Sequence, residues 1–457
     1  MSEEETRLVE NVSYGPMGII ALESSKTIGA MVNDWIVSWR NNRDSKYANT
    51  PDHDRYQRDS YLISAKCPRF GSGEAKCIIN ETIRGLDVYI LVDVCNYSLT
   101  YKVCGQINHM SPDDHFADLK RVISAMSGKA ARITVIMPFL YESRQHKRSA
   151  RESLDCAVAL QELVNLGVDS IITFDAHDAR VQNAIPTRSL ENVTPTYQFT
   201  KALLRDVPDI MMDSDHLMII SPDEGAMNRA VYFATMIGTN MGMFYKRRDY
   251  TQVVDGRNPI VAHEFLGTDV QGKDVIVIDD MISSGESMLD VAKELKKRNA
   301  GRIFVCATFG LFTSGLEKFD QAYEEGLINR VVTTNLIYQT PELLKREWYS
   351  SADMSKYIAL LIDALNHDAS ISEFLNPTDR IHRILEQHRK KQKEEAEKKA
   401  RKKTVKKTGK TTGKKVAKKT EKDKYRTFLF SFTSIRRRAD VQQKLHISPL
   451  FCFVYNF

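Results

Sequence analysis

Two adjacent carboxylates, Asp279 and Asp280, and the short Ser/Gly segment 283–287 are the residues of this chain best suited to chemistry. They follow an apolar run at 275–278, which predicts a strand that is buried on both sides of a parallel sheet and ends at the carboxylates. Open α/β sheets bind ligands at the carboxyl ends of their strands. The 283–287 segment can turn tightly and present N–H groups and hydroxyls at a helix N-terminus, as anion sites do. We predict a sugar-phosphate site, whose carboxylates take vicinal hydroxyls or a metal. A plain strand–turn–helix with an Asp N-cap is the alternative.

A second polar group lies in the basic segment 138–151, directly after the apolar run 133–137. Arg144 and Gln145 carry planar groups that can donate several hydrogen bonds, which suits a polyphosphate. A basic loop is also common on a solvated surface, so this segment alone predicts no specific ligand.

Three further positions repeat the pattern of polar residues after an apolar run. His177 lies among carboxylates, and Asp223 follows a Pro turn. A single His at a strand end is more often structural than a ligand. The cations at 246–248 begin a polar stretch that runs to Gly272 with little sign of regular structure. We expect a loop there, and long loops inside compact domains are usually functional or mobile.

The elements that position these residues alternate between strand and helix. Apolar runs of strand length are separated by stretches with helical spacing, which predicts an α/β fold with mostly parallel sheets. Two groups of strands, before and after about residue 195, indicate two domains of similar build. The strand-like runs are 88–92, 133–137, 171–174, 217–220, 275–278, 303–309 and 331–337.

The C-terminal part differs in composition from the rest. Residues 349–375 have an amphipathic helical pattern, and a charged helix could extend over 379–400. The net charge is +6, but residues 389–424 alone contain 18 Lys/Arg against 5 Asp/Glu, so the chain before them is acidic. Residues 402–424 have no apolar stripe to bury. We predict a disordered basic tail, which either binds polyanions weakly through its charge or is a solvated extension without such a function.

The chain has no apolar run near the roughly 20 residues of a membrane span, and its first residues are acidic. Its seven cysteines are scattered without a C-x-x-C pair, as in proteins with reduced thiols. We expect a cytoplasmic protein without membrane contact.

Taken in order, seven motifs resemble those of the ribose-phosphate pyrophosphokinase (PRPP synthetase) family across residues 65–340. They are FGSGE at 70–74, ETIRGLDVYI at 81–90, PFLYESRQ at 138–145, FDAH at 174–177, SPDEGA at 221–226, KRR at 246–248 and VIVIDDMISSGES at 275–287. The resemblance implies two phosphoribosyltransferase-type, Rossmann-like domains. Residues 1–194 would form the ATP side and 195–345 the ribose 5-phosphate side, followed by a helical extension at 346–388 and the Lys-rich tail at 389–457.

The resemblance also implies an Mg²⁺-dependent reaction. ATP gives its β,γ-diphosphoryl group to the anomeric hydroxyl of ribose 5-phosphate, yielding AMP and PRPP for nucleotide biosynthesis. No G-x-x-x-x-G-K-[ST] segment occurs, so the nucleotide site is not of the P-loop type. The matching motifs imply Lys246 and Arg248 as catalytic; Phe70, Glu74, Arg144 and Gln145 for ATP; His177 and Asp223 for Mg²⁺; and Asp279, Asp280, Ser283, Ser284, Gly285, Glu286 and Ser287 for ribose 5-phosphate. The two Asp residues would hold ribose hydroxyls or a second Mg²⁺.

The family usually forms homo-oligomers, often hexamers, with shared active sites, and Phe70 and Glu74 would reach ATP from a neighbouring subunit. Three residues depart from the usual motifs. Ser72 and His146 stand where carboxylates are usual, which bears on nucleotide preference and regulation. Glu286 adds a negative charge beside the phosphate site and is tolerated if its side chain points to solvent.

Two other functions are compatible with parts of the pattern. A non-catalytic relative that regulates active subunits would be expected to lose the cations or the metal ligands, which this chain keeps. A PRPP-consuming phosphoribosyltransferase would need only the Asp-Asp loop, and the ATP-side motifs argue against it.

Overall fold

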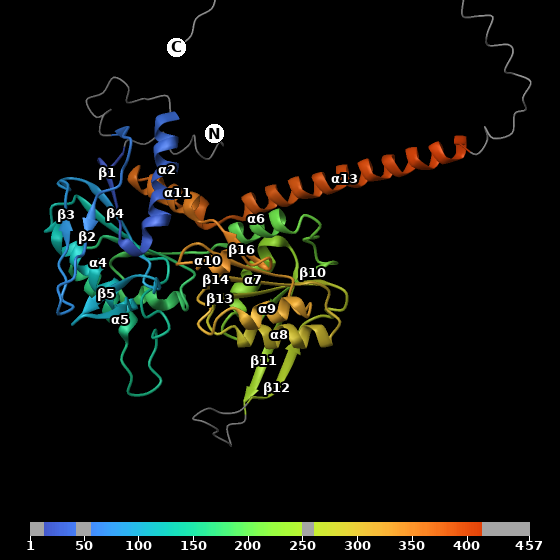
Figure 1. Cartoon of the computed structure of the whole chain (residues 1–457), viewed down its shortest axis with the longest axis horizontal. Coiled ribbons are helices and arrows are strands. Elements are labelled where there is room, and N and C mark those ends of the chain that lie inside the picture. The colour runs from blue at the N-terminus through green and yellow to red at the C-terminus, as the bar shows by residue number, and fades with distance from the viewer. Residues whose placement is uncertain (1–12, 43–55, 249–259, 414–457) are drawn as a thin grey trace, which may run out of the picture. The chain divides into compact units, whose positions relative to one another are not determined.

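The computed structural model describes residues 13–42, 56–248 and 260–413. By internal contacts the chain has two compact units, residues 1–388 and 389–457. The first unit contains two main sheets, each covered by helices on both faces (Figure 1). The predicted α/β class with mostly parallel sheets is confirmed. The contacts do not divide this unit near residue 194, so that boundary stays a prediction.

The first sheet has five parallel strands in the order β1-β4-β7-β8-β9. Alternate residues of β4 face opposite sides: Val88 and Ile90 pack toward one pair of helices, Tyr89 and Leu91 toward another. This two-sided burial explains the continuous apolar run in the sequence. The strands are β1 (Met17–Ala21), β4 (Asp87–Leu91), β7 (Arg132–Ile136), β8 (Ser170–Phe174) and β9 (Ser189–Val193). Helices α2 (Lys26–Asn42) and α11 (Ser355–Asn366) cover one face, and α4 (Pro112–Met126) and α5 (Asp155–Asn165) the other.

The second sheet has seven strands in the order β12-β11-β10-β13-β14-β15-β16, parallel except for β12. Its strands are β10 (Leu217–Ser221), β11 (Asn240–Arg248), β12 (Ile260–Leu266), β13 (Asp274–Ile282), β14 (Ile303–Gly310), β15 (Arg330–Thr334) and β16 (Tyr349–Ala352). Helices α8 (Glu286–Lys297) and α9 (Glu317–Glu324) cover one face. The other face is covered by α6 (Thr196–Asp206), α7 (Met227–Ile237) and the first turns of α13 (Thr378–Gly413). Because β10 and β13 are parallel neighbours, the loops that follow them lie at the same edge of the sheet.

Short elements connect these layers. Two small antiparallel pairs lie before and after β4: β2 (Ala65–Lys66) with β3 (Ile78–Ile79), and β5 (Thr100–Val103) with β6 (Gln106–His109). The short helices are η1 (Glu23–Ser25), η2 (Ala179–Ala184), α10 (Pro341–Leu344) and α12 (Ser372–Leu375). None of the helices within the described ranges is long and apolar enough to cross a membrane.

Helix α11 follows the second sheet in the chain but packs against α2 of the first. A buried ion pair fixes this contact, with 3.0 Å between Arg40 Nη2 and Asp363 Oδ1 and side-chain exposures of 1% and 0%. The same guanidinium donates to Asn366 Oδ1 at 2.7 Å. Because both charges are desolvated, each needs the other to remain in the core.

The polar stretch after residue 248 contains more regular structure than its composition predicts. The expected loop up to Gly272 was wrong for residues 260–266, which form β12 and pair antiparallel with β11. The rings of Phe244 and Phe265, opposite each other in the register, lie 5.2 Å apart and hold the two strands together. Figure 1 shows β11 and β12 extending as a pair beyond the rest of the sheet. Residues 249–259 lie outside the described ranges.

Two predictions about the C-terminal part also need correction. Residues 349–352 form strand β16 rather than helix, because β15 offers a free edge and Tyr349 and Ala352 bury their side chains there. Helix α13 continues to Gly413, beyond the expected end near residue 400. Ala, Glu, Lys and Arg are good helix formers, so propensity extends this helix without an apolar stripe. The remainder of the predicted disordered tail, 414–457, lies outside the described ranges.

Candidate active site

The predicted carboxylate pair lies within a strand rather than at its end. Strand β13 continues through Asp279 and Asp280 to Ile282, because the long strand β14 supplies pairing partners as far as Gly310. Side-chain exposure is 21% for Asp279 and 5% for Asp280. The two carboxylates are therefore held by a rigid backbone in the middle of the second sheet.

A hydrogen bond joins this strand to the loop after β8 of the first sheet. His177 Nδ1 and Asp280 Oδ2 are 2.6 Å apart, although 103 positions separate the residues in sequence. His177 keeps 38% of its side chain exposed. The predicted ATP side and ribose side of the chain therefore meet at this pair.

Arg229 of α7 links the carboxylates of both sheets, and the sequence analysis missed it. Its Nε donates to Asp175 Oδ1 at 2.6 Å, while Nη2 lies 3.7 Å from Asp280 Oδ2 and Nη1 lies 4.0 Å from Asp279 Oδ1. Thr308 Oγ1 donates to the second oxygen of Asp175 at 2.7 Å. In the sequence, Arg229 is a single Arg six residues after Asp223. An Arg at that position is equally typical of a solvated helix surface, so it did not indicate a site residue.

These contacts set the protonation of the carboxylates in opposite directions. Burial raises the pKa of Asp279 well above its usual value, and the neighbouring Asp280 charge adds to this. Burial alone would also raise the pKa of Asp280. The hydrogen bond to His177 and the charge of Arg229 outweigh it, so the pKa of Asp280 lies below its usual value. Asp280 is therefore the anion of the pair, and Asp279 the carboxyl that protonates first.

Asp223 follows strand β10 in the turn before α7. Its Oδ1 accepts the backbone N–H groups of Gly225 at 3.0 Å and Ala226 at 3.4 Å. Its charge contributes to raising the pKa of Asp279, so the two carboxylates lie within electrostatic range. An open pocket of about 730 Å³ borders this turn and is lined by His177, Gly225 and Arg229 among others.

The predicted phosphate loop makes a tight turn before α8. Gly285 has φ +82°, and a Cβ there would lie 2.3 Å from the Phe319 ring, so both backbone conformation and space require glycine. The N-cap residue of α8 is Gly285, which has no side chain to accept from the first N–H groups of the helix, and the Glu286 N–H donates to Ser284 Oγ at 3.5 Å. This is the backbone arrangement that binds an anion at a helix N-terminus.

Glu286, the unusual residue of this loop, is directed to the surface. Its Oε1 lies 2.7 Å from Lys318 Nζ of α9, and its side chain is 63% exposed. The negative charge is therefore partly offset by a cation, and the condition set by the sequence analysis is met.

The other predicted residues lie on three separate segments. Gln145, after β7, donates from Nε2 to the Ser153 carbonyl at 2.7 Å, and its neighbour Arg144 is exposed. Next to them, His146 Nε2 lies 3.3 Å from Asp178 Oδ2, and its ring is 5.5 Å from that of His177. The segment 138–151 thus reaches the loop after β8.

Phe70 and Glu74 lie in the turn between β2 and β3, where the Phe70 N–H donates to the Glu74 carbonyl at 2.7 Å. The Phe70 side chain is 51% exposed. Among the described residues, no hydrogen bond or ion pair joins either side chain to the cluster around Asp280.

Lys246 and Arg248 are residues of strand β11, opposite His263 and Ile260 of β12. Because β11 runs parallel to β10, the carboxyl ends of both strands point to the same side of the sheet. The two cations therefore belong to the sheet edge that carries Asp223.

The donor set fits a magnesium ion that arrives with its nucleotide. Within the described residues, no three His, Cys, Asp or Glu side chains converge as a complete metal cage. Mg²⁺ prefers oxygen ligands and is commonly held by one or two carboxylates together with waters and substrate phosphates. The carboxylate of Asp223 and the exposed ring of His177 would meet that requirement.

Comparison with known proteins gives one consistent result. The family profile described as the N-terminal domain of ribose phosphate pyrophosphokinase matches residues 17–167, and the one described as the phosphoribosyl synthetase-associated domain matches residues 252–376. The ribose-phosphate pyrophosphokinase of Shewanella oneidensis is 30% identical over 315 residues, which cover 68% of this chain and 90% of that protein. The one of Vibrio parahaemolyticus is 28% identical over 334 residues, covering 72% of this chain and 96% of that protein.

The fold agrees with these relatives. The crystal structure of phosphoribosylpyrophosphate synthetase from Mycobacterium smegmatis superposes with a TM-score of 0.58 at 19% identity, covering 77% of this chain and 99% of that one. The predicted family, enzyme class and reaction are confirmed by the relatives and profiles together. This chain belongs to the ribose-phosphate pyrophosphokinase family of transferases.

Proposed function

We propose that this chain binds Mg-ATP and ribose 5-phosphate around the His177–Asp280 pair and transfers the β,γ-diphosphoryl group to the anomeric hydroxyl. The observation that supports this most strongly is the 2.6 Å hydrogen bond between those side chains, because it joins the ATP-side motif to the ribose-side motif. The sugar O1 forms a new bond to the β-phosphorus of ATP and releases its proton to solvent. The bond from that phosphorus to the oxygen shared with the α-phosphorus breaks, and AMP leaves with this oxygen.

Ribose 5-phosphate is held by the second sheet in this proposal. The backbone of residues 283–287 and the start of α8 after Gly285 bind the 5-phosphate, with hydroxyls from Ser283, Ser284 and Ser287. Asp279 and Asp280 accept hydrogen bonds from the ribose hydroxyls. Since β13 fixes both carboxylates, the sugar is oriented before transfer begins.

ATP lies toward the first sheet. Arg144 and Gln145 bind its phosphates, and His177 with Asp223 would hold Mg²⁺ against them. When bound, the metal neutralises phosphate charge and makes the transferred group a better electrophile. The His177–Asp280 hydrogen bond leaves Nε2 of the imidazole directed away from Asp280, as a ligand nitrogen needs.

Lys246 and Arg248 supply the cations for the transition state. Diphosphoryl transfer spreads negative charge over equatorial oxygens, so positioned cations contribute more than a general base. Arg229 serves a different purpose, because its guanidinium is already engaged by three carboxylates and keeps them in register.

The proposed assembly is a homo-oligomer with shared active sites. The exposed ring of Phe70, with Glu74 beside it, would complete the adenine pocket of a neighbouring subunit, which agrees with their lack of contact to the cluster of their own chain. We further propose a cytoplasmic location and weak polyanion binding by the basic residues after 389.

The test is an assay of the full chain with Mg-ATP and ribose 5-phosphate, which follows AMP and PRPP. We expect equimolar products, and the Asp280→Asn variant should lose most of this activity while the exposed-residue control Asp290→Asn keeps it. Correctly folded protein that forms no AMP would contradict the proposal. If that inactive protein stimulates an active relative, it is a regulatory subunit; if it consumes PRPP with a base, it is a phosphoribosyltransferase.

A further inference from the structure

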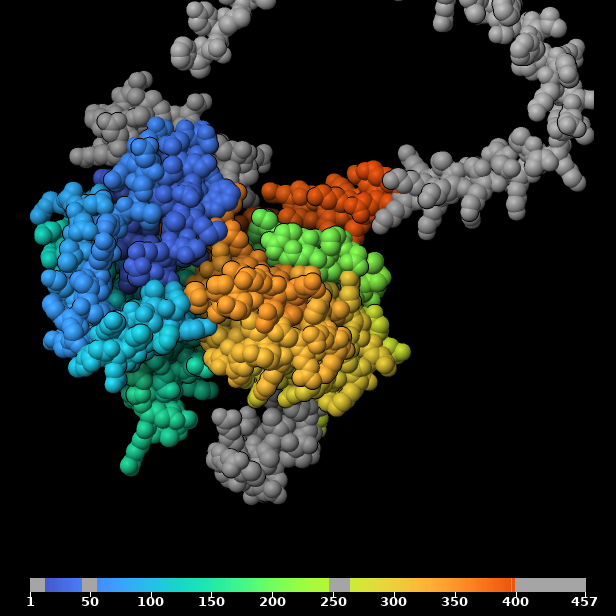
Figure 2. All heavy atoms as spheres, viewed as in Figure 1, coloured from blue at the N-terminus to red at the C-terminus, as the bar shows by residue number. Residues whose placement is uncertain are grey.

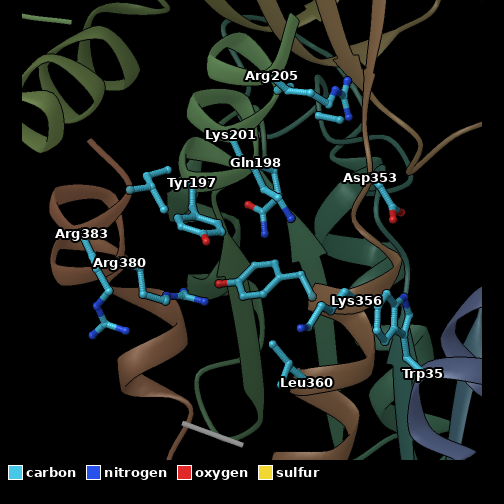
Figure 3. A pocket seen from close by; sticks show the side chains of 14 residues that line it. Trp35, Tyr197, Gln198, Lys201, Arg205, Asp353, Lys356, Leu360, Arg380 and Arg383 are labelled. Atoms are coloured by element: carbon cyan, nitrogen blue, oxygen red, sulfur yellow. The ribbon is translucent and has the colours of Figure 1, made fainter. Parts of the chain in front are cut away.

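A second pocket, of about 400 Å³, shares no lining residue with the candidate active site. It lies where α6, α11, β16 and the first turns of α13 meet, with Trp35 of α2 at its rim. Figure 3 shows the side chains that line it. In Figure 2 the green surface of α6 lies directly against the orange surface of the part of the chain around residue 350. We call it the basic pocket, after its five cations: Lys201, Arg205, Lys356, Arg380 and Arg383.

The charges of the basic pocket are strongly unbalanced. Asp353 is the one carboxylate among the lining residues. Arg205 is paired with Asp206 at 2.7 Å, outside the lining. Lys201 is exposed and, within the described part of the chain, makes no ion pair. An anion in this pocket would therefore meet excess positive charge.

Two buried polar atoms in the basic pocket have no hydrogen-bond partner. Gln198 is 8% exposed, and its Oε1 is among the buried atoms that no described group satisfies; Arg380 Nε is another. Figure 3 shows both side chains directed toward the same space, from α6 and from α13. Buried polar atoms nearly always have a partner, so this pair indicates a missing ligand with an acceptor for Arg380 and a donor for Gln198.

Ordinary structural roles explain only part of this arrangement. Arg380 packs among the rings of Tyr197 and Tyr357, 5.1 and 5.6 Å from their centroids, and donates to the Phe374 carbonyl. Lys356 covers Trp35 at 5.1 Å. These contacts stabilise the walls. They leave the Gln198 oxygen unsatisfied, and solvation of surface cations does not account for a buried amide.

We propose that the basic pocket binds a phosphoryl group that carries or adjoins a hydroxyl. A phosphoryl group offers acceptor oxygens to Lys201, Lys356 and the Arg380 guanidinium, and the hydroxyl donates to Gln198 Oε1. The volume lies in the range of small-molecule sites. Free phosphate, a sugar phosphate and a nucleoside monophosphate all carry this chemistry.

The test measures acetylation of individual lysines by mass spectrometry on the full chain, so that binding at the candidate active site does not obscure the result. Inorganic phosphate, ribose 5-phosphate and AMP are titrated separately at constant ionic strength. We expect at least one to slow the labelling of Lys201 and Lys356 saturably, while the exposed Lys129 on the first sheet reacts at an unchanged rate. Which probe protects at the lowest concentration identifies the source of the phosphoryl group.

Two variants decide whether protection comes from this pocket. Gln198→Met keeps the side-chain volume but removes the acceptor, and should weaken protection about tenfold. Arg383→Gln removes an exposed cation and should weaken it less. The proposal would be overturned if no probe protects Lys201 and Lys356, or if Lys129 is protected equally. It would also be overturned if both variants keep the affinity of the native chain for the probe. Circular dichroism of both variants confirms that they fold.

Discussion

At the candidate active site Arg229 lies among the carboxylates of Asp175, Asp279 and Asp280, whereas the lining of the basic pocket holds five cations and one carboxylate, Asp353. The first arrangement has no excess of positive charge before any substrate binds. It suits a ligand that brings its own cation, as Mg-ATP does. The second suits a bare anion. The two proposed phosphate sites therefore differ in whether carboxylates already offset the positive charge of the cations.

Among these changes, the removal of Arg229 should destabilise the candidate active site most. Arg229→Met leaves Asp175 buried without its partner, and we expect a loss of about 3–5 kcal/mol in unfolding free energy. Urea unfolding measures this. The matched control is Arg180→Met, whose ion pair with Asp178 leaves the Arg side chain 76% exposed and whose loss should change the unfolding free energy far less. Similar losses in the two variants would show that Arg229 is not needed to neutralise the cluster.

Because Arg229 is engaged by carboxylates, other cations must stabilise the transition state at the candidate active site. Lys246→Ala should therefore lower turnover about 10²–10³-fold, which is about 3–4 kcal/mol, with little change in ribose 5-phosphate binding. Steady-state kinetics with Lys129→Ala as the control measures this. A rise in KM at unchanged kcat would mean that Lys246 binds substrate rather than stabilising the transition state.

The carboxylate of Asp93 differs from both sites, because it is buried and no cation of the described residues pairs with it. Asp93 accepts N–H groups of Cys95 at 2.8 Å and Tyr338 at 2.7 Å, and burial raises its pKa to about 7. Because the folded protein holds this proton more tightly than the unfolded chain, unfolding free energy should fall as pH rises from about 4 to 7. We expect about 1 kcal/mol of this fall for each pH unit between 5 and 6.5.

The measurement compares urea unfolding of the native chain and Asp93→Asn across that pH range. Other groups titrate in both proteins, so the difference between the two curves isolates Asp93. A constant difference would show that the carboxyl ionises normally in the folded state.

The smallest expected effect concerns Glu286. Glu286→Ser removes one charge of an exposed pair with Lys318, which should change unfolding free energy by less than about 1 kcal/mol. The KM for ribose 5-phosphate should fall only severalfold, because the carboxylate already faces solvent. A fall larger than about 100-fold would mean that Glu286 turns toward the phosphate during binding.

The sequence predicted the layers of the fold better than the ends of its elements. The apolar run at 275–278 was found because both faces of β13 are buried, but the strand's extension to Ile282 depends on β14, which lies 20 residues further along the chain. Strand β16 has no such run, and only its pairing with β15 makes it a strand.

The same limit applies to the site. Asp280 and His177 could be found singly from their positions after apolar runs. Their hydrogen bond joins two sheets and depends on packing that no local pattern encodes. Arg229 escaped notice because a single Arg on a helix is usually solvated, and only its burial between three carboxylates distinguishes it.

The buried pair of Arg40 and Asp363 has a consequence for how the chain is made. The first sheet is complete in sequence at Val193, yet α11, one of the two helices that cover one of its faces, begins only at Ser355. During synthesis the ribosome therefore releases the whole second sheet before that face can be closed. Until then Arg40 has no counter-charge from α11, and the apolar face under α11 is open to chaperones and to other nascent chains.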